Sequence, residues 1–127
     1  MKTLERYSDH AYALLRIMAG FMMAFHGVQI LFGAFSPHPP SVSWSQAWFG
    51  GAIELVGGLA VMIGLETRAA AILCSGTMAV AYIQFHWKFQ FDSRFFPAVN
   101  QGELAAIYCF VFLLIGCRGA VKWGLDR

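Results

Sequence analysis

The stretch that decides the fold contains no Asp, Glu, Lys or Arg, and it runs over residues 17–53: IMAGFMMAFHGVQILFGAFSPHPPSVSWSQAWFGGAI. One transmembrane helix needs about 20 apolar residues, so this run is long enough for two helices. The break falls in the segment SPHPPS, residues 36–41, because clustered prolines cannot continue a helix and favour an exposed loop. We therefore predict a first span over residues 12–35 and a second over residues 46–65.

Two further apolar runs follow this pair. The run from Ala69 to Trp87 also lacks charged residues, and it predicts a third span over residues 68–87. The charged, proline-containing segment after it indicates a loop. The apolar stretch beyond that loop predicts a short fourth span over residues 101–118. The expected architecture is all-α: one membrane domain, residues 1–127, built as a bundle of four transmembrane helices.

The composition agrees with a membrane protein and excludes several other classes. Hydrophobic residues make up 58% of the chain and charged residues 13%, against about 45–50% and about 25% in soluble domains. The net charge of +2, without a basic stripe, argues against nucleic-acid binding. Cys74, Cys109 and Cys117 form no CxxC pair and have no metal-ligand spacing. We therefore expect no metal site and no disulfide framework.

The distribution of basic residues predicts the topology, because Lys and Arg are retained on the cytoplasmic side of a membrane. Only Lys88 and Arg94 fall in the two loops on one side. The outer aromatic belt on that side contains Trp44, Trp48 and Trp87. The other side has seven of the nine basic residues, namely Lys2, Arg6, Arg16, Arg68, Arg118, Lys122 and Arg127. We therefore predict that both termini are cytoplasmic.

Two ionisable residues lie inside the predicted spans. His26 in the first span and Glu54 in the second are both roughly 12 Å below the outer surface, at 1.5 Å per residue. A charged group at the bilayer centre costs at least about 2.5 kcal/mol, so each needs a partner within the protein. Their common depth makes His26 the expected partner of Glu54. One interpretation is a ligand or proton site, and the other is a buried pair that only fixes helix register.

Small residues surround this predicted pair. Glycines flank Glu54 at positions 50–51 and 57–58, and the first span has its own small face, formed by Gly20, Ala24 and Gly27. Small residues allow two membrane helices to approach closely. We therefore predict a close contact between the first and second spans, with Glu54 in a poorly solvated interface.

Four other polar residues fall in the same outer half: Gln29 and Glu103 are further ligand or proton candidates, and Gln84 and His86 are secondary candidates. For Gln29, Gln84 and His86 the favoured interpretation is interhelical hydrogen bonding or anchoring at the interface. Glu103 is either a site residue or a helix cap that interacts with the helix dipole. Arg16 lies near the inner end of the first span, and we expect it to extend to a lipid phosphate of the inner leaflet.

The chain resembles the DoxX family of small membrane proteins from bacteria and archaea. The matching stretches, in order, are RIMAG (16–20), HGVQ (26–29), GAIELVGGL (51–59), GLETRAA (64–70), GELA (102–105) and WGLD (123–126). The resemblance implies a four-helix multi-pass protein of the cytoplasmic membrane. It also implies site positions at Arg16, His26, Glu54, Arg68 and Glu103.

The resemblance implies a redox function as well, because the protein that gives the family its name is a subunit of a thiosulfate:quinone oxidoreductase. We expect a non-covalently bound quinone or another lipophilic substrate in the outer half of the bundle, with His26 and Glu54 as its hydrogen-bond and proton partners. The sequence has no haem-ligand pair, cluster motif or nucleotide loop. The chain would therefore be a subunit that receives electrons from a partner, and not a complete enzyme.

The chain departs from the family pattern in two ways, and two other functions compete with the redox function. Many family members have Lys where this chain has Gln29, and the absence of a cysteine pair argues against thiol exchange. The alternative function is a non-catalytic structural or assembly subunit, which would bind partner subunits or another copy through its glycine faces and its aromatic outer loop. A transporter is disfavoured, because the polar groups form no continuous path to the inner side.

Overall fold

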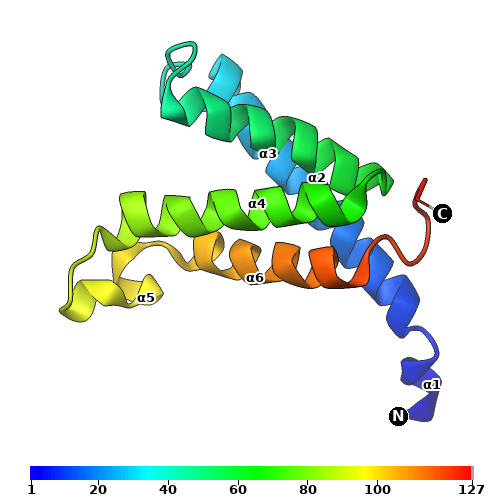
Figure 1. The fold of residues 1–127 in the computed structure, drawn as a ribbon. Coiled ribbons are helices and arrows are strands. Elements are labelled where there is room, and N and C mark those ends of the chain that lie inside the picture. The colour runs from blue at the N-terminus through cyan, green and yellow to red at the C-terminus, as the bar shows by residue number, and fades with distance from the viewer. Residues whose placement is uncertain (127) are drawn as a thin grey trace.

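The computed structural model describes residues 1–126, and Arg127, one of the basic residues counted above, lies outside them. The described chain is helical, and its elements follow one another in the order shown in Figure 1. They are α1 (Lys2–Glu5), α2 (Ser8–Phe32), α3 (Gln46–Ile63), α4 (Thr67–Ala81), the π-helical turn η1 (Tyr82–Trp87), the 3₁₀ turn η2 (Ser93–Phe95), α5 (Pro97–Asn100) and α6 (Glu103–Arg118).

Three of these helices are long and apolar enough to cross a membrane: Ser8–Phe32, Gln46–Ile63 and Thr67–Trp87, the last of which joins α4 to η1. They occupy the first three predicted spans. The first helix stops at Phe32, three residues short of the predicted end, because Gly33 takes the left-handed conformation (φ 68°) and its N–H bonds to the carbonyl of Gln29. The fourth helix, α6, has 16 residues, fewer than the about 20 that a full crossing requires.

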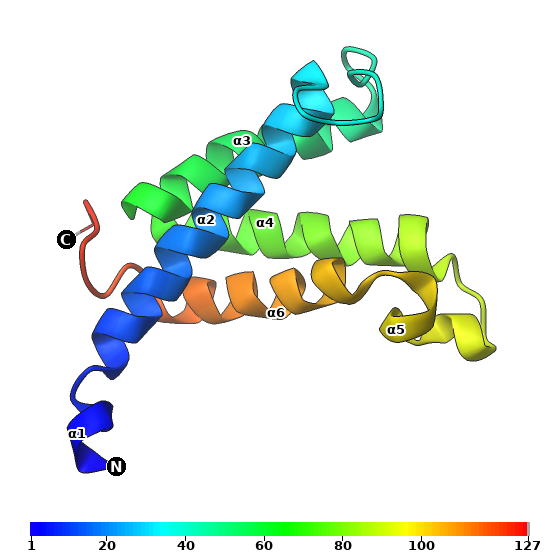
Figure 2. The ribbon, with the colours of Figure 1, turned by 180° about the vertical axis from the view of Figure 1, so that it is seen from behind.

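The helices form two pairs, α2 with α3 and α4 with α6. Figures 1 and 2 show that the pairs meet at the end where the C-terminal segment lies and diverge toward the α2–α3 loop and α5. The molecule is therefore a wedge. We call the converging end the closed end and the diverging end the open end. The apolar core includes Tyr12, Met23, Val61, Cys74, Met78, Phe112 and Ile115.

Glycines bring α2 and α3 into backbone contact, as predicted. A Cβ atom on Gly20 would lie 2.6 Å from the carbonyl oxygen of Gly58, and one on Gly27 would lie 2.7 Å from that of Gly51. Such distances leave no room for any side chain at these positions. The contact is therefore a direct backbone packing, which compensates for the weak hydrophobic drive between helices in lipid.

The closed end is organised by Arg16, which is wholly buried (0% exposed). Its guanidinium donates five hydrogen bonds to backbone carbonyls: Val61 at 2.6 Å, Met62 at 2.9 Å, Ala120 at 3.2 Å, Lys122 at 2.7 Å and Trp123 at 3.0 Å. The prediction that Arg16 extends to lipid phosphate is wrong. Val61 and Met62 belong to the last turn of α3, whose carbonyls have no intrahelical partners. The C-terminal segment folds back and supplies the other three carbonyls.

Residues 119–126 lie across the closed end. The Tyr12 hydroxyl donates to the carbonyl of Gly119 (2.7 Å), and the Asp126 N–H donates to the carbonyl of Gly64 (2.7 Å). The Asp126 carboxylate accepts from the Glu66 N–H (2.7 Å) and from both the N–H (2.9 Å) and the hydroxyl of Thr67. It therefore caps the N-terminus of α4, where a negative charge is favourable.

The backbone contact between α2 and α3 can be tested with a matched pair of glycines. In Gly58→Ala the new Cβ would lie 2.5 Å from the Ala24 nitrogen, whereas Gly76 has nothing within 4 Å. We expect Gly58→Ala to lower the free energy of unfolding by about 1–3 kcal/mol, the usual cost of overpacking. Gly76→Ala should be neutral or slightly stabilising. Denaturation followed by circular dichroism measures both, and equal effects would contradict the contact.

The Asp126 cap should depend on pH. Its hydrogen bonds with Thr67, followed by that with Glu66, lower the pKa of the Asp126 carboxyl below its ordinary value. A group whose pKa is lowered by folding stabilises the fold above its unfolded pKa of about 4, and this contribution is lost as the pH falls through the lowered value. In an NMR titration, we expect the amide signals of Glu66 and Thr67 to shift with a midpoint below about 4. Asp126→Asn should remove the transition, and a midpoint at or above the ordinary value would refute the cap.

Candidate functional site

A large cavity lies between the two helix pairs toward the open end of the wedge. Its volume is about 1400 Å³, and its walls come from α2, α3, α4, η1 and α6. Most of the lining is apolar, including Phe21, Met23, Phe25, Ile53, Leu73, Met78 and Leu104. Pockets for small ligands typically have apolar walls with a few polar groups that orient the ligand. This cavity is the natural candidate for a binding site.

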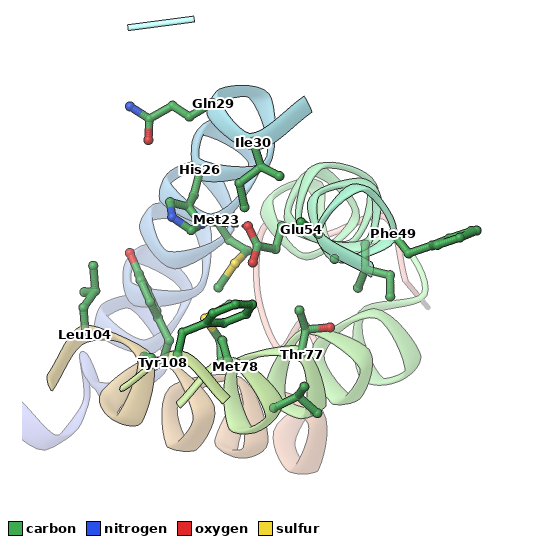
Figure 3. Close-up of a pocket in the computed structure, with 18 of the residues that line it drawn as sticks. Met23, His26, Gln29, Ile30, Phe49, Glu54, Thr77, Met78, Leu104 and Tyr108 are labelled. Atoms are coloured by element: carbon green, nitrogen blue, oxygen red, sulfur yellow. Dashed lines mark hydrogen bonds and ion pairs between the residues drawn. The ribbon is translucent and has the colours of Figure 1, made fainter. Parts of the chain in front are cut away.

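Helix geometry directs Glu54 toward α2. Gly51, Glu54 and Gly58 are spaced by three and four residues, so they share one face of α3, and this face packs on α2. Glu54 is consequently buried (3% exposed). Both Glu54 and His26 belong to the cavity wall, as Figure 3 shows.

The two ionisable groups form the predicted contact. His26 Nδ1 lies 2.7 Å from Glu54 Oε2, and the side chain of His26 is 52% exposed whereas that of Glu54 is 4% exposed. Nδ1 is therefore the ring nitrogen that the Glu54 carboxyl group engages. Nε2 of His26 makes no hydrogen bond with any residue that the structure describes. The pair therefore holds the imidazole in one orientation and leaves its second nitrogen free for a ligand.

Gln29 and His86 also line the cavity, as predicted for the outer half. The Gln29 amide donates to the carbonyl of Phe35 (3.0 Å). His86 Nδ1 lies 3.3 Å from the carbonyl of Asn100. Each of these side chains thus ties a cavity wall to a neighbouring loop, which fits the interpretation that they anchor the structure.

The other predicted residues lie outside the cavity. Gln84 accepts a hydrogen bond from Gln46 (2.7 Å), and Glu103 is exposed at the first residue of α6. Arg68 lies near the closed end, where its guanidinium donates to the carbonyls of Gly116 (3.1 Å), Cys117 and Arg118 (3.3 Å). Arg16 and Arg68 therefore cap the C-termini of α3 and α6, where positive charge is favourable.

Sequence reasoning missed one polar residue of the cavity, Tyr108. It lies on α6, and its side chain points across the cavity toward His26 (Figure 3). The available signal was weak: Tyr108 is the one tyrosine within the predicted fourth span.

No group of three or more His, Cys, Asp and Glu in residues 1–126 is arranged to hold a metal ion.

Comparison with known proteins gives two matches. The DoxX family model matches residues 11–87, a segment that contains both His26 and Glu54 but not Tyr108. An uncharacterised protein of Haemophilus influenzae (strain ATCC 51907 / DSM 11121 / KW20 / Rd) is 35% identical over 134 residues, which cover 100% of this chain and 96% of that protein. No solved structure matches the chain significantly.

The contact between His26 and Glu54 can be measured with a double-mutant cycle. We expect His26→Ala and Glu54→Gln to show a coupling energy of about 1.5–3 kcal/mol, the range for hydrogen bonds to charged groups. His26→Ala alone should be the more damaging change, because it leaves a buried carboxylate without a partner. Chemical denaturation provides the free energies. His86→Ala is the control, since His86 lines the same cavity without contacting Glu54, and a coupling energy for His26 no larger than that for His86 would refute the pair.

Proposed function

The chain belongs to the DoxX family, and we propose that it is a membrane subunit of a quinone-linked oxidoreductase complex. The observation that carries the proposal is the His26–Glu54 pair in the wall of a cavity with mostly apolar walls. An ionisable pair inside a membrane helix bundle is a functional candidate by default, because its burial is costly.

The residues present fit a quinone. The apolar walls suit a ring and an isoprenoid tail, and the free nitrogen of His26 suits a carbonyl oxygen. When bound, a quinone supplies two-electron redox chemistry that is coupled to the uptake of two protons. The sequence carries no nucleotide loop or cluster motif. We therefore place the electron donor on a partner subunit.

In this proposal His26 donates the proton and Glu54 orients the imidazole ring. When both ring nitrogens are protonated, His26 holds a hydrogen on Nε2, from which it can donate to an oxygen in the cavity. Glu54 compensates the positive charge of that imidazolium and keeps the ring oriented through Nδ1 (2.7 Å). Most of the cavity wall is apolar, and an electrostatic interaction in apolar surroundings is stronger than it would be in water.

Topology forms part of the same proposal. Arg16, Arg68 and the C-terminal segment lie at the closed end, and the excess of basic residues there supports a cytoplasmic position for that end and for both termini, in a bacterium or archaeon. The cavity then lies in the outer half of the cytoplasmic membrane, and α6 serves as a fourth span. The membrane helices contact the lipid bilayer directly.

The arrangement at the two ends argues against a transporter and supports one alternative. Residues 119–126 lie across the closed end, and none of them belongs to the cavity lining. The outer loop, in contrast, gathers aromatic rings around Trp87, and Phe91 in this cluster is 84% exposed. This surface favours a second candidate function, a structural or assembly subunit that docks on partner subunits.

Purification from native membranes in a mild detergent separates the two functions. We expect wild-type protein to retain quinone, measured by solvent extraction and ultraviolet absorbance, and the variant with His26→Ala and Glu54→Gln to lose most of it. The partner subunit should copurify with both. Quinone reduction by membranes carrying the double variant should fall in parallel.

Other outcomes of the same experiment would contradict the redox proposal. If wild-type protein and the double variant carry the same amount of quinone and support the same rate of quinone reduction, the redox proposal fails. If a stable partner then copurifies with both proteins, the alternative function as a structural subunit is supported.

A further inference from the structure

Tyr108 differs from the other tyrosines of the chain in its hydrogen bonding. The hydroxyl of Tyr7 accepts from Arg6, and those of Tyr12 and Tyr82 donate to backbone carbonyls (both 2.7 Å). Among the residues that the structure describes, the hydroxyl of Tyr108 has no hydrogen-bond partner. A hydroxyl in apolar surroundings loses free energy unless it is hydrogen bonded, so a partner from outside the chain would satisfy it.

The position of Tyr108 defines what that partner could be. Tyr108 and His26 lie in opposite walls of one cavity, on α6 and α2, and the tyrosine points toward the histidine (Figure 3). The ring of Tyr108 packs on Phe112, with ring centroids 5.8 Å apart, and Phe112 is wholly buried. Packing on Phe112 therefore restricts the orientation of the Tyr108 ring, and the hydroxyl faces the same cavity as the free Nε2 of His26.

The geometry points to Tyr108 as a second ligand-binding residue, which donates a hydrogen bond to the polar head of a quinone-type ligand from the wall opposite His26. This inference rests on the proposed function and deepens it. The recognised chemistry is an uncharged ring with an oxygen acceptor at each of two edges, one for the imidazole and one for the phenol. No Lys or Arg lines the cavity within the described residues, which disfavours a phosphate head group.

The apolar tail of such a ligand has a defined place. Phe21, Met22 and Phe25 of α2 and Leu104 of α6 belong to the lining of the cavity. All four of these residues are exposed at the protein surface. A head group between His26 and Tyr108 would thus leave its tail among side chains that contact lipid, and a molecule dissolved in the membrane could enter from the side.

Binding of menadione, a two-carbonyl ring without a long tail, tests the inference on the full-length chain in lipid nanodiscs. Isothermal titration calorimetry, corrected with empty nanodiscs, measures the dissociation constant. We expect Tyr108→Phe to weaken binding by about 5- to 10-fold, the loss that one hydrogen bond typically produces. The control Tyr7→Phe removes a hydroxyl at the closed end and should change binding less than about 2-fold.

Thermal unfolding of the same variants without ligand shows whether weaker binding comes from a less stable fold. Tyr108→Phe preserves the ring that packs on Phe112, so we expect it to unfold at the same temperature as the wild type. If wild-type protein binds menadione and Tyr108→Phe binds it equally well, this inference is overturned while the proposed function stands. If wild-type protein shows no saturable binding, the proposed quinone site fails and the role of Tyr108 fails with it.

Discussion

Arg16 joins three separate parts of the chain through a single buried guanidinium. Removing a charged group from water costs several kcal/mol, and only good hydrogen-bond geometry offsets this cost. The five carbonyl partners come from the end of α3 and from the C-terminal segment, while the arginine itself belongs to α2. Because all three segments must meet to satisfy the guanidinium, the closed end of the wedge is fixed in position. The divergence of the helix pairs at the other end, and hence the cavity, depends on this anchor.

The two ends of the molecule therefore use polar groups in opposite ways. At the closed end, charged side chains are paired with the backbone: Arg16 and Arg68 cap helix C-termini, and Asp126 caps a helix N-terminus. In the cavity, His26 and Tyr108 keep hydrogen-bonding groups without partners among the described residues. Polar groups of the first kind hold the fold together, whereas those of the second kind are available to a ligand. This contrast distinguishes a structural role from a binding role within one small chain.

Much of this arrangement could be predicted from the sequence. The charge-free runs located the three long helices, and the small residues around Gly27 and Gly58 predicted the α2–α3 contact. The common depth of His26 and Glu54 predicted their pairing. These features depend on local composition and on helix geometry, which a sequence displays directly.

The residues whose roles were not predicted from the sequence share a physical cause. Arg16 was expected at the lipid surface because its partners are backbone carbonyls, which leave no signature in a sequence. Three of the five belong to a segment more than one hundred residues away, and the other two belong to α3. Tyr108 was missed for a related reason, since its importance comes from the divergence of the helix pairs across the cavity. Arg68 was expected as a site position from the family resemblance, and its contacts with the last carbonyls of α6 became visible only in the structure.

The wedge has a mechanical consequence for the membrane around it. A protein whose helices converge at one end and diverge at the other occupies unequal areas in the two leaflets. The leaflet at the open end must accommodate the larger cross-section, so lipids with small head groups and curved regions of the bilayer relieve the resulting packing stress.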